Sequence, residues 1–210
     1  QALSRITIVK LIGGVQVPGT QFATPPAELE KIAGYGRDIA AARAEAKRLL
    51  REAGVPDGYS FTFKNRGLPH PYEPVGIWLI DQWRQIGLNV KQVSLESAAW
   101  LQAQKQGEFE VSTNAPCNSI VEPDMDLHWF LTTSPVNFSR HKDTVMDDLY
   151  ARQSRATDPD ERKKILRAFE KRLYDEEVHY IMTFQWNRIV AYNSRVHGWT
   201  ITPSHFLNCQ

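Results

Sequence analysis

The sequence has little of several features that mark specialised classes of protein. Lys and Arg number 25 against 24 Asp and Glu, and no block of about five like charges occurs, so neither a dedicated nucleic-acid binder nor a charged tail is expected. No apolar run approaches the roughly 18 residues that span a bilayer. With 42% hydrophobic and 23% charged residues among 210, the chain has the composition of a globular protein with a sizeable core.

Cysteine is also scarce, because only Cys117 and Cys209 are present and they form no CxxC or metal-ligand spacing. We interpret them as two unrelated thiols, and a single disulfide in an oxidising compartment is the alternative. The sequence starts at Gln1, and no basic segment followed by an apolar run marks a signal peptide. A mature chain and an excised segment would both have such a sequence, and of the two we expect an excised segment of a longer protein.

Catalytic signatures are scarce as well. The six histidines form neither HxxxH nor HExxH, and neither a GxSxG nor a GxxxxGK motif occurs. The histidines are expected to be surface residues or locally hydrogen-bonded ones. Glu122 and Asp124 flank Pro123, which favours a turn or a helix cap over a catalytic carboxylate pair. We expect no enzyme activity, no metal and no cofactor.

Apolar periodicity predicts alternating helices and strands in the first two thirds of the chain. The predicted helices cover residues 3–12, 39–53, 72–86 and 96–106. The predicted strands cover residues 59–63, 88–93 and 109–113. Asp38 is suited to cap the second helix and Gly54 to end it, and Trp78 and Trp83 lie on the apolar face of the third. This alternation predicts a parallel sheet with right-handed crossovers.

The last third is predicted to be mainly helical. A helix is expected over 143–155, with Val145, Met146, Leu149 and Tyr150 facing inward, and another begins at Asp158 and runs to about 176. Two β-rich runs, 178–184 and 188–192, close the chain. Because no internal repeat is found, we predict a single α/β domain.

Polar side chains follow the last predicted strand of the sheet, over residues 114–119, and Trp129 comes soon after them. Ligands of open α/β sheets bind outside the carboxyl ends of the strands. Asn and Ser side chains with a nearby Trp suit a neutral or weakly polar organic solute. The alternative is a surface loop with one buried Trp.

Several segments occur in an order that resembles the C-terminal part of the family 5 extracellular solute-binding proteins, the dipeptide, oligopeptide and nickel receptors of bacterial ABC importers. The segments that carry the resemblance are residues 2–18, 44–58, 82–90, 107–110, 122–124, 158–174, 188–192 and 196–199. Each motif is weak by itself, but together they are collinear over nearly the whole chain. The resemblance is therefore specific.

The resemblance implies an α/β lobe of the periplasmic-binding-protein type (type II), with a mixed, mostly parallel sheet flanked by helices. Residues 1–210 would form the second lobe of a two-lobed clamp, and the N-terminal lobe, with its signal peptide, would be absent from this sequence. Such a receptor closes by a hinge around its solute in the periplasm and presents it to the permease subunits of an ABC importer, without covalent chemistry. The expected partners are a small-molecule or peptide solute, the permease and the missing lobe.

The residues predicted to bind the solute lie on loops after strands: Asn65, Arg66, Asn114, Asn118, Ser119 and Trp129. Arg66 can fork onto a carboxylate or phosphate, or it can be a solvated loop residue. In peptide-binding members, an Asp four residues before the loop Pro commonly pairs with the ligand's α-amino group, and here Ser119 stands at that position. This difference removes the charge partner that a free N-terminus would need, so it argues against a simple di- or oligopeptide. A neutral, anionic or sugar-like solute is at least as well suited, and a peptide, an opine and an oligosaccharide are all kept as candidates.

Two other classes of function are weighed against transport. The same fold fused to a DNA-binding or signalling segment would be the ligand-sensing domain of a regulator. A hydrolase or transferase of α/β type is a distant third, since the motif search found no catalytic signature. A signal peptide ahead of this segment would indicate transport, whereas a helix-turn-helix would indicate regulation.

Overall fold

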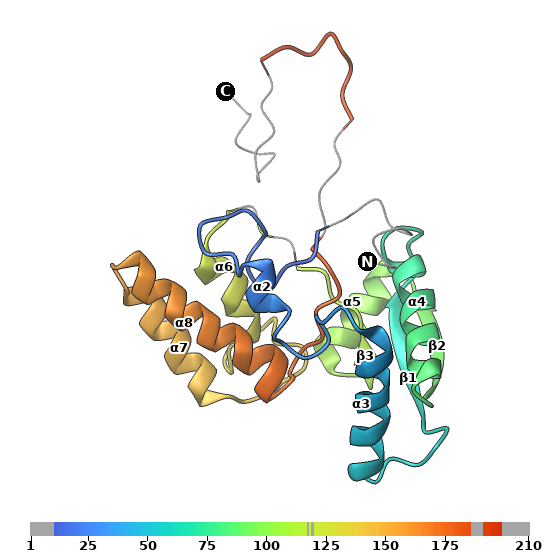
Figure 1. Cartoon of the computed structure of the whole chain (residues 1–210). Helices are drawn as coiled ribbons and strands as arrows, with labels where there is room; N and C mark the ends of the chain where they lie inside the picture. Colours follow the sequence, from blue (N-terminus) through green and yellow to red (C-terminus); the bar gives the residue numbers. More distant parts are fainter. Residues whose placement is uncertain (1–10, 117, 119, 186–190, 199–210) are drawn as a thin grey trace. The chain divides into compact units, whose positions relative to one another are not determined.

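The computed structural model describes residues 11–116, 118, 120–185 and 191–198, which fall into two compact units (Figure 1). Unit 1 contains residues 26–114 and 138–140, and unit 2 contains the remaining described residues. No described helix is long and apolar enough to cross a membrane. The assignment of residues 1–210 to one lobe stays a prediction.

Unit 1 is built on a parallel sheet with the strand order β2-β1-β3, flanked by helices. The central strand β1 (Ser60–Arg66) pairs along its whole length with β2 (Asn89–Leu95) and over two residues with β3 (Val111–Ser112). Helix α4 (Tyr72–Gln85) connects β1 to β2, and α5 (Ser97–Gln106) connects β2 to β3. The predicted alternation and the parallel sheet are confirmed.

Helix ends in unit 1 follow the signals in the sequence. The Asp38 carboxylate accepts a hydrogen bond from the Ala41 amide and starts α3 (Ile39–Glu52). Gly54 follows its end with φ +70°, a conformation that residues with a Cβ rarely adopt. Helix α3 buries none of its residues, and Leu49 on its apolar side is 50% exposed. A short helix, α2 (Pro26–Leu29), precedes it.

The core of unit 1 lies where α4 and α5 cover the sheet. Phe63 is fully buried, and Trp83 packs edge-on against Phe61 and Phe63, with ring centroids 5.3 and 5.5 Å away. Trp78 and Trp83 are half-buried, so the two rings expected in the core lie at its border. Helix α4 approaches the sheet closely because Gly76 has no side chain, and a Cβ there would overlap the amide of Asn65.

Unit 2 is mainly helical. Helix α7 (Thr144–Arg155) packs beside α8 (Pro159–Lys171), which continues as a π-helical turn, η2 (Arg172–Glu176) (Figure 1). Before them come α6 (Pro123–Leu127) and the 3-10 turn η1 (His128–Phe130). The buried side chains include Leu127, Phe130, Met146, Leu149, Ile165, Leu166, Phe169 and Leu173. Both long helices therefore occur where the sequence predicts them.

Three expectations in unit 2 need correction. Val145 was expected to face inward but is 48% exposed, because the buried stripe of α7 runs through Met146, Leu149 and Gln153. Residues 178–184 contain no strand, and within the described ranges next to them the β-pairing is limited to an isolated bridge between Gln185 and Leu11. That bridge also shows that the helix expected over 3–12 does not include Leu11.

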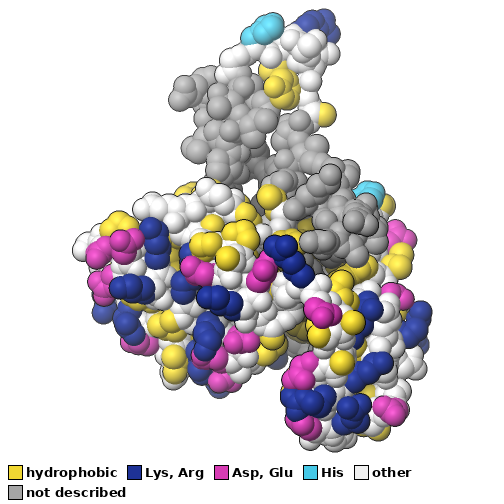
Figure 2. All heavy atoms as spheres, viewed as in Figure 1, with side chains coloured by type: hydrophobic (Ala, Val, Ile, Leu, Met, Phe, Trp, Pro, Cys, Tyr) yellow, Lys and Arg dark blue, Asp and Glu magenta, His cyan; other side chains and the backbone are white. Residues whose placement is uncertain are grey.

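Other predicted residues and segments lie outside the described part of the chain. These are residues 3–10, most of the run 188–192, Cys117 and Cys209. In Figure 2, Lys and Arg side chains are interspersed with Asp and Glu over the visible face of the described residues. That distribution matches the near balance of charge in the sequence.

A buried carboxylate holds residues 11–25 against α8 in unit 2. Glu170 is 3% exposed, and it accepts hydrogen bonds from the Val15 amide (2.6 Å) and from the Thr24 hydroxyl. Gly14 allows this approach, because a Cβ at that position would overlap Oε2 of Glu170. Arg167, one helical turn earlier, donates to the carbonyl oxygens of Phe22 and Ala23.

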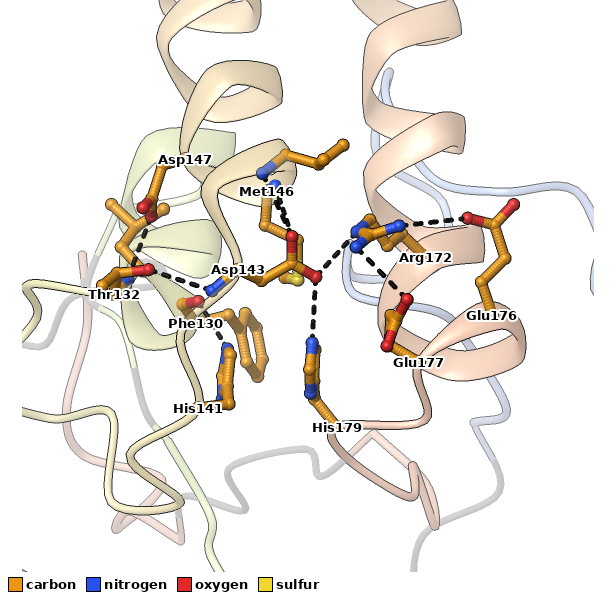
Figure 3. A network of polar contacts seen from close by, with 12 residues as sticks. Phe130, Thr132, His141, Asp143, Met146, Asp147, Arg172, Glu176, Glu177 and His179 are labelled. Atoms are coloured by element: carbon orange, nitrogen blue, oxygen red, sulfur yellow. Dashed lines mark hydrogen bonds and ion pairs between the residues drawn. The ribbon is translucent and has the colours of Figure 1, made fainter.

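A second buried carboxylate, Asp143, organises the start of α7 (Figure 3). Its Oδ1 accepts hydrogen bonds from the amides of Val145 and Met146, and its Oδ2 accepts one from Arg172 Nε at 2.7 Å. His179 Nε2 lies 3.0 Å from the same Oδ2. Burial by itself raises the pKa of Asp143, but these donors outweigh it and lower the pKa to about 2. The carboxylate is therefore ionised at neutral pH.

Candidate functional site

Three of the predicted solute-binding residues lie at one edge of the sheet in unit 1. Asn65 and Arg66 are the last two residues of β1, and Asn114 comes two residues after β3. The parallel register pairs Lys64 with Ser112, so its continuation places Arg66 level with Asn114. The carboxyl ends of neighbouring parallel strands thus bring these side chains to the same edge.

Asn65 supports this edge from inside. Its side chain is completely buried, and Nδ2 donates to the Tyr72 carbonyl oxygen at 2.7 Å. Its Oδ1 accepts from the Arg66 amide (3.0 Å) and from the Thr113 hydroxyl (2.8 Å). The Asn65 amide therefore ties the ends of β1 and β3 to the start of α4.

Removal of this amide is expected to destabilise the unit. Asn65→Ala should lower the free energy of unfolding by about 2–3 kcal/mol, because it removes all three hydrogen bonds of a completely buried side chain. Thr113→Val, which removes only one of the three bonds, should cost about 1 kcal/mol. Urea unfolding followed by circular dichroism measures both values. A loss in Asn65→Ala no larger than that in Thr113→Val would contradict the supporting role of Asn65.

Arg66 is held in place without an acidic partner. Its Nε donates to Ser97 Oγ at 2.9 Å, and Nη1 lies 3.5 Å from the Tyr72 hydroxyl. The guanidinium carbon lies 5.3 and 5.4 Å from the ring centroids of Tyr72 and Trp100, within the range of cation–π attraction. No described carboxylate forms an ion pair with Arg66. Nη2 has no hydrogen-bond acceptor within the described ranges, so it can donate to a bound anion.

Asn114 is half-buried beside this cation in the register of the strands. Its side chain makes no hydrogen bond to any described residue, so both the oxygen and the amino group can serve a ligand. Tyr72, Ser97 and Trp100, which hold Arg66, were not predicted from the sequence. For Ser97 and Trp100, the sequence holds one relevant pattern: they are three residues apart at the start of a helix that follows a strand, so they share one helix face.

Two further predicted residues meet in unit 2. Asn118 Nδ2 donates to the Met125 carbonyl (2.9 Å) and to Asp126 Oδ1 (2.6 Å). Trp129 Nε1 lies 3.5 Å from Asn118 Oδ1, and its ring is half-buried. Ser119 lies outside the described residues. Asn118 therefore joins the loop to α6 and orients Trp129.

Asp126 on α6 contacts this loop through Asn118 and was not predicted from the sequence. Burial raises its pKa above the ordinary value for Asp, and the hydrogen bond from Asn118 opposes that effect. Its three-residue spacing from Trp129 is the one signal that could have drawn attention to it. Glu122 and Asp124 instead bind Arg162, which agrees with a structural role for this pair.

The match to a known family covers more than half of the chain. Residues 1–138 match the family described as bacterial extracellular solute-binding proteins, family 5 middle. The chain belongs to the family 5 extracellular solute-binding proteins. The resemblance found in the sequence is thus confirmed, and so is the prediction of a binding protein instead of an enzyme.

Relatives of this family 5 protein include the periplasmic oligopeptide-binding protein OppA of Escherichia coli. It is 28% identical over 159 residues, which are 71% of this chain and 29% of the relative. The solved structure of Haemophilus influenzae OppA in complex with RPPGFSPFR has a TM-score of 0.67 at 19% identity, and it covers 81% of this chain and 34% of that one. This likeness confirms the predicted fold class.

A third relative is the periplasmic binding protein DppA of Helicobacter pylori, solved in complex with the peptide STSA. Its TM-score is 0.57 at 25% identity, over 70% of this chain and 28% of that one. This family 5 chain therefore spans about a third of the length of the relatives it matches.

Proposed function

We propose that this chain is part of the solute-binding component of an ABC importer and that its solute is a peptide. The observation that carries the proposal is its similarity to a protein named as oligopeptide-binding and to two proteins that were solved with bound peptides. In this proposal the protein works in the periplasm and presents its peptide to the permease. Hinge closure around the peptide is the only step, and no bond is made or broken.

In this proposal the peptide's C-terminal carboxylate binds at the edge of the sheet in unit 1. Arg66 is positioned by Ser97 and two aromatic rings, and its Nη2 has no acceptor among the described residues. A guanidinium held in this way loses little side-chain freedom on binding and suits a carboxylate. Asn114 offers a donor and an acceptor for the neighbouring peptide group. Ser119 carries no charge that could pair with a peptide's α-amino group, so in this proposal another residue holds that group.

The first test is native mass spectrometry of the protein purified without denaturation. Co-purified masses spaced by amino-acid residues are expected. A single non-peptide mass would contradict the choice of a peptide and would favour an opine or an oligosaccharide instead.

The second test compares a tetrapeptide with its C-terminal amide by isothermal titration calorimetry. Amidation should weaken binding about 10-fold or more, because one charge-assisted pair is lost. Arg66→Ala should weaken binding of the free acid and remove the preference. Arg84→Ala, an exposed Arg in the last turn of α4, should change neither. Equal affinity for the acid and the amide in the unmodified protein would overturn the role of Arg66 but not peptide binding itself.

Asn114 can be tested with a matched control. Asn114→Ala should weaken peptide binding about 5-fold or more, through loss of hydrogen bonds to the ligand. Asn89→Ala changes the same residue type at the opposite end of the sheet, where Asn89 is exposed, and should leave affinity unchanged. Equal effects of the two substitutions would place the peptide elsewhere.

A further inference from the structure

Two histidine rings stack face to face in unit 2. The ring centroids of His141 and His179 lie 4.1 Å apart, and the ring planes differ by 13°. His141 precedes the N-terminus of α7, whereas His179 comes after η2 at the end of α8. The stack therefore attaches the chain that leaves α8 to the start of α7 (Figure 3).

The hydrogen bonds fix which nitrogen of each ring carries a proton. His141 Nε2 lies 2.8 Å from the Phe130 carbonyl oxygen, which can only accept, so Nε2 carries hydrogen. His179 Nε2 lies 3.0 Å from the Asp143 carboxylate, so the same holds there. In the neutral pair each ring therefore has no hydrogen on Nδ1, and the charged form of either ring has a hydrogen on that atom as well.

The carboxylates near the two histidine rings can compensate one positive charge on the pair better than two. Asp143, the N-cap of α7, and Asp147 in its first turn favour a positive charge on His141. Arg172 from η2 already shares Asp143 Oδ2 with His179, and it also contacts Glu177 at 3.2 Å and Glu176 at 3.7 Å. Tyr180 adds an uncharged ring edge to His141. A second proton would place two like charges at the stacking distance, with Asp143 already paired to Arg172.

The segment that carries His179 is itself under strain. Val178 has φ +49°, in the left-handed region that β-branched residues avoid. It follows the π-helical turn η2, and such turns are rare and often lie at functional sites. Contacts made by His179 and its neighbours must hold Val178 in this conformation. Loss of those contacts would let the backbone relax.

We propose that the His141–His179 stack is an acid-sensitive latch, which opens when both rings are protonated and releases residues 177–180 from the N-terminus of α7. The stacking geometry, the shared carboxylate and the strained Val178 together define the two states. In the closed state the neutral or singly protonated pair holds the segment. In the open state repulsion separates the rings, and the segment relaxes.

The direction of the His141 pKa agrees with this proposal. Burial lowers the pKa of His141 below its ordinary value of 6.5, and the nearby His179 adds to the effect. The closed state thus binds a proton on His141 less readily than the open one, so the latch weakens as the pH falls below about 6.5. Asp143 stays ionised in this range, since its pKa is about 2.

Hydrogen exchange of residues 177–185, measured by mass spectrometry at about pH 7.5 and about pH 5 and corrected for intrinsic rates, tests the latch. Protection should fall about 10-fold at the lower pH in the unmodified protein. In His141→Gln, which keeps a donor for Phe130 but cannot be charged, the loss should be less than about 2-fold. His128→Gln, which also changes a histidine bound to a backbone carbonyl, should behave like the unmodified protein.

Two results would overturn the latch. One is unchanged protection of the unmodified protein at low pH, and the other is the same loss of protection in His141→Gln as in the unmodified protein. If His141→Gln opens the segment at both pH values, nitrogen-15 NMR of the unmodified protein decides. In that experiment, residues 177–180 must open over the same pH range in which Nδ1 of the two rings becomes protonated. Opening at a pH where neither ring changes its protonation would exclude the mechanism.

Discussion

Replacing Glu170 by alanine is expected to lower the free energy of unfolding of unit 2 by about 3–4 kcal/mol. The carboxylate accepts hydrogen bonds from the Val15 amide and the Thr24 hydroxyl, and it is almost fully buried. Its removal would leave a buried amide without an acceptor and a cavity beside Gly14. Urea unfolding monitored by circular dichroism measures the loss.

Two variants serve as controls for this result. Glu161→Ala removes an exposed carboxylate from the first turn of the same helix and should cost less than about 1 kcal/mol. Gly14→Ala leaves Glu170 in place but puts a Cβ where its Oε2 lies, so it should destabilise the protein by a similar amount to Glu170→Ala. If Gly14→Ala were neutral, the close approach of residues 11–25 to α8 would be wrong.

Asp143→Ala is expected to cost about 3–4 kcal/mol at neutral pH, the second large effect. The substitution removes the N-cap of α7, the partner of Arg172 and the partner of His179 together. Asp158→Ala provides the matched control, because Asp158 caps α8 through one amide and is exposed. It should cost only about 1 kcal/mol. Equal losses would mean that the ion pair and the histidine contribute nothing.

The same residue predicts a pH dependence at low pH. The folded pKa of about 2 lies below the ordinary value of 3.8, so the stability it contributes is complete above about pH 4 and is lost as the pH falls through 2. The loss should amount to about 2 kcal/mol. Asp143→Ala should lack this component of the acid profile. A profile of the variant that parallels that of the unmodified protein would show that other carboxylates cause the acid sensitivity.

Much of the fold could be predicted because its signals are local. Asp38 and Gly54 mark the ends of α3, and alternation at Phe61 and Phe63 marks β1. The run 178–184 was wrongly predicted as a strand because its composition favours strands, whereas strand formation also requires a partner that the described chain does not offer. Local pattern therefore predicts elements better than it predicts pairing.

In the candidate site, too, the features set by local sequence could be predicted, whereas those set by tertiary contacts could not. The positions of Arg66 and Asn114 at strand ends followed from the predicted sheet, since parallel strands end at one edge. The burial of Asn65 and the support of Arg66 by Ser97 did not follow, because each depends on a residue brought near by tertiary packing. Spacing along the chain contains no information on such contacts.

The contact between Val15 and Glu170 has a consequence for the order of folding during synthesis. These residues are 155 positions apart, so residues 11–25 leave the ribosome long before the helix that holds them exists. The strands and crossover helices of unit 1 are contiguous from Ser60 to Ser112 and can assemble while the last third is still being made. Unit 2 must instead wait for α8, and until then its N-terminal segment remains exposed to chaperones and proteases.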